Sequence, residues 1–219
     1  SHLVWNNWSI GINTIPTIKN ALLSGQPFTL DLLKKIHKSF YTQDESGEYG
    51  AVLAPGEIKS PNMKEIKWSI PPEKLAKLSA QVNEIDQMYV SLGLQPQETA
   101  EGNQISASPA ILSTRDGNLR PAHPIYVRAH LENLAQFINQ MVQNARQHKP
   151  LIWNNKIFTP MEVALFAQQT IVRAHAFNDG NGRISRYLQD LILSLFDMPF
   201  ISSGTVSYTH LRAHETSLH

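Results

Sequence analysis

The chain has 219 residues, of which 42% are hydrophobic and 17% are charged, and its formal net charge is +1. This composition is ordinary for a globular protein with a real core, and the small net charge argues against nucleic acid or an anionic membrane surface as a partner. Cysteine is absent, which excludes disulfides and thiolate metal sites, and no apolar run approaches the roughly 20 residues that cross a bilayer.

The first predicted helix lies within Pro27–Phe40 and has Thr29 as its N-cap. Residues 1–15 before it are expected to be an N-terminal extension, because the opening SHLVWNNW lacks an initiator Met and is typical of a chain that starts inside a longer protein. The apolar face of the helix repeats at helical spacing and consists of Leu30, Leu33, Ile36, His37 and Phe40.

Residues 66–70 alternate apolar and polar side chains within a segment punctuated by Gly and Pro. Ile66, Trp68 and Ile70 would face one side, and Lys67 and Ser69 would face the other. Alternation with a period of two predicts a small β-hairpin here.

A second helix is predicted over Pro71–Leu92, with proline in its first turn. Its apolar residues follow a three-four rhythm: Leu75, Leu78, Val82, Ile85, Tyr89 and Leu92. The polar, turn-rich residues 93–121 then break the pattern. Because long loops without structure are uncommon, this insertion is a candidate for choosing a partner, although a tolerated surface loop is the simpler interpretation.

Three more helices are predicted in the second half of the chain. The first has an apolar face made by Leu131, Leu134, Ile138, Met141 and Ala145. The second begins with a capping box of Thr159 and Glu162 around Pro160, and it is apolar on most faces, which predicts a central position. The third starts near Arg183 or Ile184 and carries the stripe Ile184, Tyr187, Leu188, Leu191, Ile192, Leu195 and Phe196. The predicted fold class is all-α, a helical bundle with one small β-hairpin.

The last residues, 204–219, have no such period and resemble vector-derived sequence. His210 and His214 stand four residues apart and would suit a helical metal clip, but a surface or vector-derived tail is the preferred interpretation. The folded domain is therefore expected to span residues 16–203, including the insertion at 93–121.

The break between the last two helices, AFNDGNGR, has the composition of a phosphate site. The helix that follows leaves its first backbone N–H groups unpaired, and these groups and the helix dipole favour an anion. Gly180 and Gly182 let the backbone adopt positive φ and approach a ligand, and Asn181 tolerates the same geometry and offers its amide. Arg183 and Arg186 lie three residues apart, so both can hold phosphate oxygens from one side.

Two further side chains extend this site towards catalysis. Asp179 would repel a bare phosphate but fits a divalent cation, because Mg²⁺ is usually held by one or two carboxylates together with phosphate oxygens. His175 lies four residues earlier at the end of the preceding helix, and an imidazole suits proton transfer near neutral pH. A base, a metal carboxylate and a phosphate cradle indicate transfer of a phosphorus-containing group to a hydroxyl. Phe177 is expected to point into the core.

Taken singly, these residues have simpler explanations. A histidine at a helix end is usually a capping or surface residue, and GNG is usually a turn. The segment is not a dinucleotide fingerprint, since Ser185 stands where the third glycine would be, and no Gly-Lys-Ser/Thr follows to make a Walker loop. Only the ordered combination points to catalysis.

The stretch HAFNDGNGRISR, residues 175–186, resembles the signature of the Fic family, H-x-F-x-(D/E)-G-N-G-R-x-x-R. Every fixed position matches: His175, Phe177, Asp179, Gly180, Asn181, Gly182, Arg183 and Arg186. The resemblance runs from about Pro16 to Phe200. It includes the early helix and the β region around residues 66–70, which is known in this family as the flap. It implies an α-helical protein that uses ATP to transfer AMP to a Ser, Thr or Tyr hydroxyl of a target protein.

The resemblance also implies a role for each motif residue. His175 would be the general base, and Asp179 would hold Mg²⁺ against the α- and β-phosphates. The anion hole would be formed by Gly180, Asn181 and Gly182. Arg183 would bind the distal phosphates, and Arg186 would support the phosphates or the loop. A target segment would add as a strand to the flap residues Ile66, Lys67, Trp68, Ser69 and Ile70.

Three positions depart from the family pattern or select a branch within it. Ala176 replaces the proline often found after the histidine, which should alter the stiffness of the loop and not its chemistry. Gly182 is kept where the kinase-like Doc branch has lysine, which favours AMP transfer over γ-phosphoryl transfer. Gly50 stands where relatives often carry an arginine, so one flap anchor is absent.

The inhibitory motif of many relatives, (S/T)-x-x-x-E-(G/N), has no match here. The nearest stretch, Gln97–Gly102, has glutamine in place of the hydroxyl residue. Inhibition then comes from a separate protein, or was lost with missing sequence, or does not exist, as in secreted effectors. The expected location is the cytoplasm, or the cytosol of a host cell for an effector.

Two other functions remain open from the sequence. The same cradle reads phosphates and not the base, so the enzyme would equally suit transfer of UMP, or of phosphocholine from CDP-choline. A non-catalytic nucleotide-binding module would be indicated by loss of the histidine or the metal carboxylate, yet His175 and Asp179 are both present. The expected partners are ATP, Mg²⁺ and a protein that presents a hydroxyl, with neither nucleic acid nor a membrane.

Overall fold

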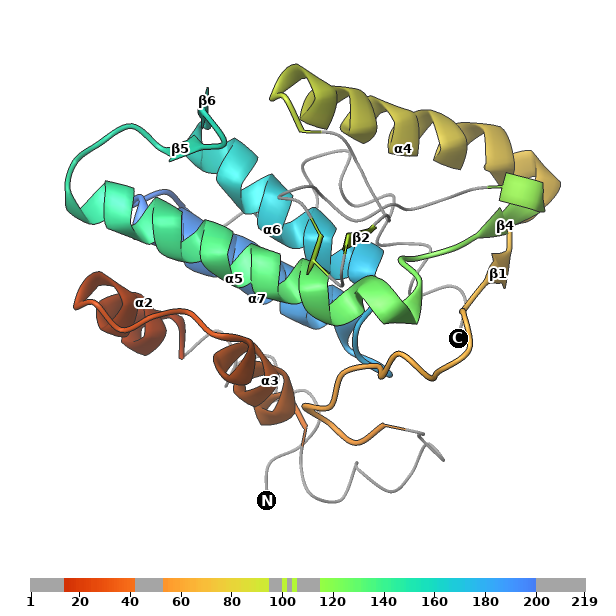
Figure 1. The fold of residues 1–219 in the computed structure, drawn as a ribbon, viewed down its shortest axis with the longest axis horizontal. Helices are drawn as coiled ribbons and strands as arrows, with labels where there is room; N and C mark the ends of the chain where they lie inside the picture. Colours follow the sequence, from red (N-terminus) through yellow and green to blue (C-terminus); the bar gives the residue numbers. More distant parts are fainter. Residues whose placement is uncertain (1–13, 42–52, 95–99, 102–103, 106–114, 200–219) are drawn as a thin grey trace.

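The computed structural model describes residues 14–41, 53–94, 100–101, 104–105 and 115–199 (Figure 1). Six α-helices account for most of this part of the chain: α2 (Ile15–Leu23), α3 (Leu30–Ser39), α4 (Pro72–Ser91), α5 (Pro124–Arg146), α6 (Pro160–Ala174) and α7 (Asn181–Leu195). The predictions about residues 1–13, Gly50 and the tail with His210 and His214 lie outside the described residues, as does most of Gln97–Gly102.

The centre of the bundle is formed by α5, α6 and α7, and α2 packs against α7 (Figure 1). Every residue of α6 from Val163 to Ala174 is buried, which confirms its predicted central position. The predicted capping box is present at its start. Thr159 Oγ1 accepts a hydrogen bond from the Glu162 N–H, and the Glu162 carboxylate accepts one from the Thr159 N–H. These bonds satisfy donors that a helix start leaves open.

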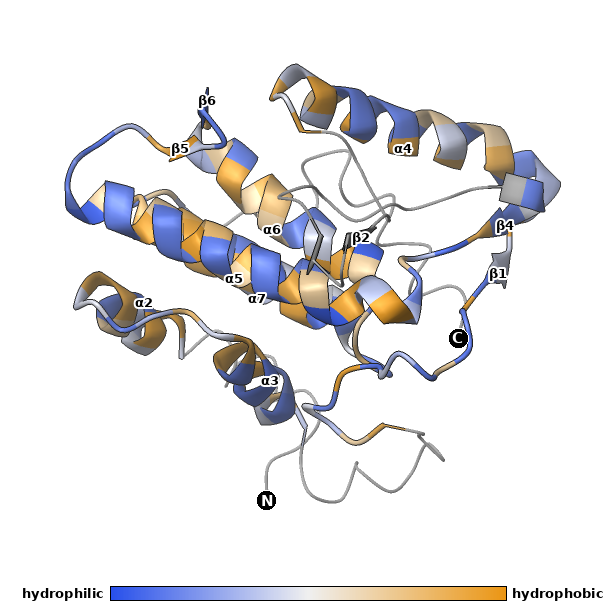
Figure 2. Ribbon diagram, in the orientation of Figure 1, coloured by the Kyte–Doolittle hydropathy of each residue, from blue (hydrophilic) through white to orange (hydrophobic). Residues whose placement is uncertain are grey.

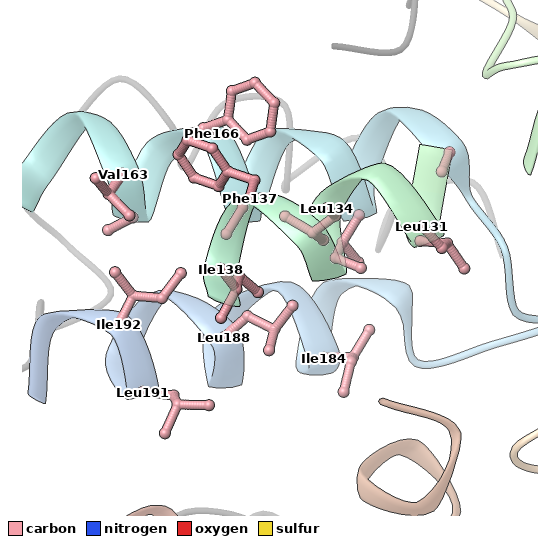
Figure 3. Packing of buried hydrophobic residues seen from close by; sticks show 14 of the residues in the cluster. Leu131, Leu134, Phe137, Ile138, Val163, Phe166, Ile184, Leu188, Leu191 and Ile192 are labelled. Carbon is pink, nitrogen blue, oxygen red and sulfur yellow. The ribbon is translucent and has the colours of Figure 1, made fainter. Parts of the chain in front are cut away.

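Side chains from these three helices interlock in the core (Figure 3). Figure 3 labels Leu131, Leu134, Phe137 and Ile138 from α5, Val163 and Phe166 from α6, and Ile184, Leu188, Leu191 and Ile192 from α7. The rings of Phe137 and Phe166 lie 4.3 Å apart between centroids. Burying each such side chain contributes roughly 1.5–3 kcal/mol. In Figure 2, hydrophobic and hydrophilic residues alternate along α4 and α5, as expected of amphipathic helices.

An ion pair between Arg173 of α6 and Asp86 of α4 links the two helices. The Arg173 side chain is fully buried, and its Nη1 lies 2.5 Å from Asp86 Oδ1. Its Nε donates to Gln169 Oε1 at 3.2 Å, and its guanidinium carbon lies 5.5 Å from the centre of the Tyr89 ring. Because a buried charge is costly without a partner, this pair fixes where α4 can sit on the bundle.

A strand is present within the predicted residues 66–70, at Trp68–Ser69, but its pairing was predicted wrongly. Strand β1 (Trp68–Ser69) pairs antiparallel with β4 (Asn118–Leu119), with Trp68 opposite Leu119, and does not form a local hairpin. The partner lies beyond α4, within the residues expected to form an insertion loop, so no nearby turn marks it. The Ile70 N–H donates to the carbonyl of Gly117, in the 3₁₀ turn η2 (Arg115–Gly117), and extends the pairing.

Two local hairpins complete the described strands. One joins β2 (Ala100–Glu101) to β3 (Gln104–Ile105), inside the predicted insertion. The other joins β5 (Ile152–Trp153) to β6 (Lys156–Ile157). Its turn residues Asn154 and Asn155 both have positive φ, as a tight two-residue hairpin turn requires.

The all-α fold class and the five predicted helices are confirmed as α3 to α7, and the described strands form three small antiparallel sheets. The short helix α2 was not predicted, and α7 begins at Asn181, before the expected start at Arg183 or Ile184. Within the described ranges, no helix combines the length and the hydrophobicity needed to cross a membrane.

The buried ion pair gives a first prediction. Asp86→Asn should lower the free energy of unfolding by about 3 kcal/mol, because it leaves the fully buried Arg173 charge uncompensated. Glu84→Gln removes a carboxylate from an exposed position of the same helix and should stay within about 0.5 kcal/mol of the wild type. Urea unfolding of the two variants measures the difference, and equal stabilities would contradict the role given to Asp86.

Candidate active site

The predicted motif lies on the loop between α6 and α7, and successive main-chain groups of that loop are hydrogen-bonded. His175 ends α6 in a left-handed conformation, with φ 45° and ψ 52°, and its N–H donates to the Ile171 carbonyl. The Ala176 carbonyl accepts from the Lys59 N–H at 2.8 Å. The Gly180 carbonyl accepts from the Ile184 N–H at 3.0 Å, which opens the hydrogen-bond ladder of α7.

Asn181 clasps this loop with its side chain. Its Oδ1 accepts from the Phe177 N–H at 3.0 Å, and its Nδ2 donates to the Phe177 carbonyl at 2.9 Å. The side-chain amide that was predicted to be offered to a ligand is therefore engaged inside the protein. What Asn181 presents at the start of α7 is its backbone N–H. Phe177 is fully buried, as predicted.

His37 of α3 supports the same loop. The sequence pattern had shown it only as one residue of an apolar helix face. Its ring stacks on Phe177 with 3.8 Å between centroids. The Gly56 N–H donates to its Nδ1 at 2.9 Å, so the ring proton is on Nε2, which donates to the Asp179 carbonyl at 2.7 Å. Burial, opposed by the bond to Asp179, lowers the pKa of His37 from 6.5 to about 4, so the ring is neutral.

Gly180 occupies a position where a side chain would be strained. Its φ is +75°, and a Cβ there would clash with the Tyr41 hydroxyl oxygen and lie 3.2 Å from His37 Nε2. The left-handed backbone and the close approach of Tyr41 both favour glycine.

The start of α7 presents backbone donors beside this glycine. Because the helical ladder opens with the Ile184 N–H, the N–H groups of Asn181, Gly182 and Arg183 precede it. Such groups, together with the helix dipole, favour an anion. The earlier start of the helix thus brings Asn181 and Gly182 into its first turn, and positive φ is confined to Gly180 within this pair of glycines.

Asp179 and Arg183 face each other across this turn. Arg183 Nη2 lies 3.5 Å from Asp179 Oδ2, and the two side chains are 25% and 46% exposed. The Arg183 guanidinium also lies 4.7 Å from the centre of the Tyr41 ring and donates to its hydroxyl at 3.3 Å. The carboxylate and the guanidinium therefore reach solvent at the same point. Arg186 follows one turn later on α7 and is half-buried.

His175, at the start of the loop, is only 6% exposed. Trp68 of β1 makes an edge contact with it, with 4.8 Å between ring centroids. This contact brings the predicted flap to the candidate base, although Ile70 is buried and Lys67 and Ser69 are exposed. Lys59, itself 6% exposed, places Nζ 3.0 Å from His175 Nδ1. No local sequence pattern marks Lys59, so its contact with His175 was not predicted.

The residues present fit a magnesium ion that is shared with a nucleotide. No group of three or more His, Asp or Glu side chains in the described part of the chain could hold a metal without other ligands. Asp179 offers one partly exposed carboxylate next to the backbone N–H groups at the start of α7, and Mg²⁺ commonly binds one or two carboxylates with phosphate oxygens and water.

Two glycines give a matched test of the cradle. Gly180→Ala and Gly117→Ala both place a Cβ at positive φ, 75° and 69°, but only the first meets other atoms within 4 Å. Gly117→Ala should cost about 1 kcal/mol of stability from backbone strain. Gly180→Ala should cost at least twice as much, because Tyr41 or the loop must move. Thermal unfolding compares the two variants. Equal losses of stability would show that the close approach of Tyr41 to Gly180 contributes nothing to the cost.

The lowered pKa of His37 predicts a pH dependence of stability. Its folded value of about 4 lies below the unfolded 6.5, so its contribution is complete above pH 6.5 and is lost as pH falls towards 4. The shift corresponds to about 3 kcal/mol. The stability difference between wild type and His37→Gln should therefore be largest at neutral pH and shrink as pH falls, measured by urea unfolding. A difference that is constant with pH would contradict this assignment.

A comparison with protein-family models agrees with this geometry. The model described as Fic/DOC family matches residues 27–193, which is more than half of the chain and includes α3, the flap strand, α6, the loop and most of α7. Proteins of this family are in general transferases. The chain belongs to the Fic/DOC family.

Proposed function

We propose that this transferase moves AMP from ATP to a Ser, Thr or Tyr hydroxyl of a target protein. The observation that carries the proposal is that one braced loop holds both an imidazole, at its start, and the first backbone amides of α7, at its end. The imidazole can take a proton from an attacking hydroxyl, and the amides can hold the phosphate that is attacked.

In the proposed reaction, the target hydroxyl oxygen attacks the α-phosphorus of ATP. A bond forms between that oxygen and phosphorus, the bond from phosphorus to the bridging oxygen breaks, and pyrophosphate leaves. The hydroxyl proton passes to His175. Since Lys59 contacts Nδ1, the nitrogen that meets the target is Nε2.

The nucleotide phosphates are assigned to the start of α7. The backbone N–H groups of Asn181, Gly182 and Arg183 would hold phosphate oxygens, and the Arg183 guanidinium would exchange Asp179 for a distal phosphate. Tyr41 keeps Arg183 close to this position by stacking. Arg186, one turn further on, is assigned a supporting role for the phosphates or the loop.

Asp179 is the residue proposed to hold Mg²⁺. Bound there with the nucleotide, the ion would supply positive charge to the phosphate oxygens. Asp179 itself is kept in place by the His37 bond to its carbonyl, which leaves its carboxylate directed to the solvent side.

The target is assigned to the flap, residues 66–70. Strand addition along β1 would present a hydroxyl beside Trp68 without reading the target's sequence. Because His175 is only 6% exposed, the target must pass or displace the Trp68 ring to reach it.

The donor is identified by labelling. Incubation with cell lysate and ATP labelled at the α-phosphorus should label proteins, whereas ATP labelled at the γ-phosphorus should not. Label transferred only from UTP, GTP or CDP-choline would replace AMP transfer by one of the other transfers that the same cradle permits. Label from the γ-phosphorus would make the enzyme a kinase.

A matched pair of histidine variants tests the base. His175 and His148 both have positive φ, 45° and 52°, a conformation that asparagine tolerates. His175→Asn should lower the rate of AMP transfer by about 10²- to 10⁴-fold, the usual loss on removing a positioned base. His148→Asn, at the exposed end of α5, should transfer at the wild-type rate. Equal rates for the two variants would remove His175 from the chemistry.

A further inference from the structure

Lys59 reaches the candidate base from a segment that no motif includes. It lies between α3 and β1, and it is attached to the loop at two points. Its N–H donates to the Ala176 carbonyl at 2.8 Å, and its Nζ lies 3.0 Å from His175 Nδ1. Its side chain is as buried as that of the histidine, since each residue is 6% exposed. The position of the amine is therefore fixed by the fold.

We propose that Lys59 and His175 form a proton-sharing pair, in which Lys59 controls whether Nε2 of His175 is free to accept the proton of the target hydroxyl. The proposal rests on the function proposed above and adds a positioning residue to it. Lys59 acts on the reaction only through the imidazole.

The protonation states that this contact permits follow from the atoms involved. A lysine ammonium has three donors and no acceptor, and a neutral imidazole carries a proton on one of its two nitrogens. While Lys59 is charged, Nδ1 must be the acceptor, so the ring proton stays on Nε2. In that state Nε2 donates and cannot accept, and His175 is not a base towards the target.

Loss of one proton from the pair makes His175 a base. A neutral Lys59 amine accepts the Nδ1–H, which leaves Nε2 bare. During transfer, the O–H bond of the target breaks and an Nε2–H bond forms, while the Nδ1–H bond breaks and an Nζ–H bond forms on Lys59. The pair then carries the proton as a lysine ammonium, and the ring is neutral again.

Among the described residues, four titratable or aromatic groups on the neighbouring elements have contacts of their own. Arg173, two residues before His175 on α6, pairs with Asp86 of α4. On the loop, Asp179 pairs with Arg183. On α3, His37 is held neutral between Gly56 and the Asp179 carbonyl, and from β1 the uncharged Trp68 ring contacts His175.

The first test is the pH dependence of kcat/KM for AMP transfer in the wild type, in Lys59→Met and in Lys64→Met. Wild-type activity should still rise by about tenfold or more between pH 7 and 9, as the pair loses its proton. Lys59→Met leaves a lone imidazole and should be flat over that range. Lys64, at an exposed position in the same segment, should behave as wild type when replaced. Parallel profiles for wild type and Lys59→Met would overturn the pair.

Nitrogen-15 NMR of the His175 ring measures which ring nitrogen is protonated, without any need for AMP transfer. The signals of this ring are those that disappear in His175→Asn. In the wild type, Nδ1 should be unprotonated at neutral pH and become protonated in the alkaline range, while Nε2 does the opposite. If the wild-type ring shows no alkaline exchange, the pair is wrong even where AMP transfer is intact. If the exchange occurs but no AMP is transferred, the pair stands and the proposed function fails. If Lys59→Met fails to fold, the alkaline proton exchange between the two ring nitrogens of wild-type His175 still tests the pair.

Discussion

The loop between α6 and α7 depends on one constraint: its main-chain polar groups are paired with the rest of the protein from three directions. The Asn181 side chain bonds both main-chain groups of Phe177, His37 bonds the Asp179 carbonyl, and the backbone of Lys59 bonds the Ala176 carbonyl. With these groups satisfied, the loop can keep a left-handed residue at each end. The candidate base and the helix amides are then held in a fixed relation before any ligand arrives.

This pre-organisation has a consequence for binding. Asp179 and Arg183 already form an ion pair, so a nucleotide and its metal would exchange partners in a site whose charges are balanced. Phosphate would take over the guanidinium, and the metal would take over the carboxylate. Part of the entropy cost of ordering these side chains is already met on folding, because Tyr41 contacts Arg183 and His37 bonds the main chain of Asp179.

The sequence was sufficient to predict the features that local patterns determine, namely helices, helix starts and the motif loop. Periodicity located α3 to α7, the Thr159–Glu162 capping box located the start of α6, and the motif located the loop. Contacts between distant segments could not be read from it. The pairing of Trp68 with Leu119 crosses α4, Lys59 meets His175 across more than half of the chain, and His37 appeared only as one residue of a helix face. Each of these depends on packing, for which a single sequence carries no periodic signal.

The most direct measurement of the central claim is the backbone amide NMR spectrum during titration with ATP and Mg²⁺. If the start of α7 binds phosphate, the amide signals of Asn181, Gly182 and Arg183 should shift most, because their N–H groups acquire oxygen acceptors. The same titration with adenosine should leave those three signals in place. Saturable binding that leaves these amides unchanged, or that shifts amides at the β5–β6 end of the bundle, would contradict the account.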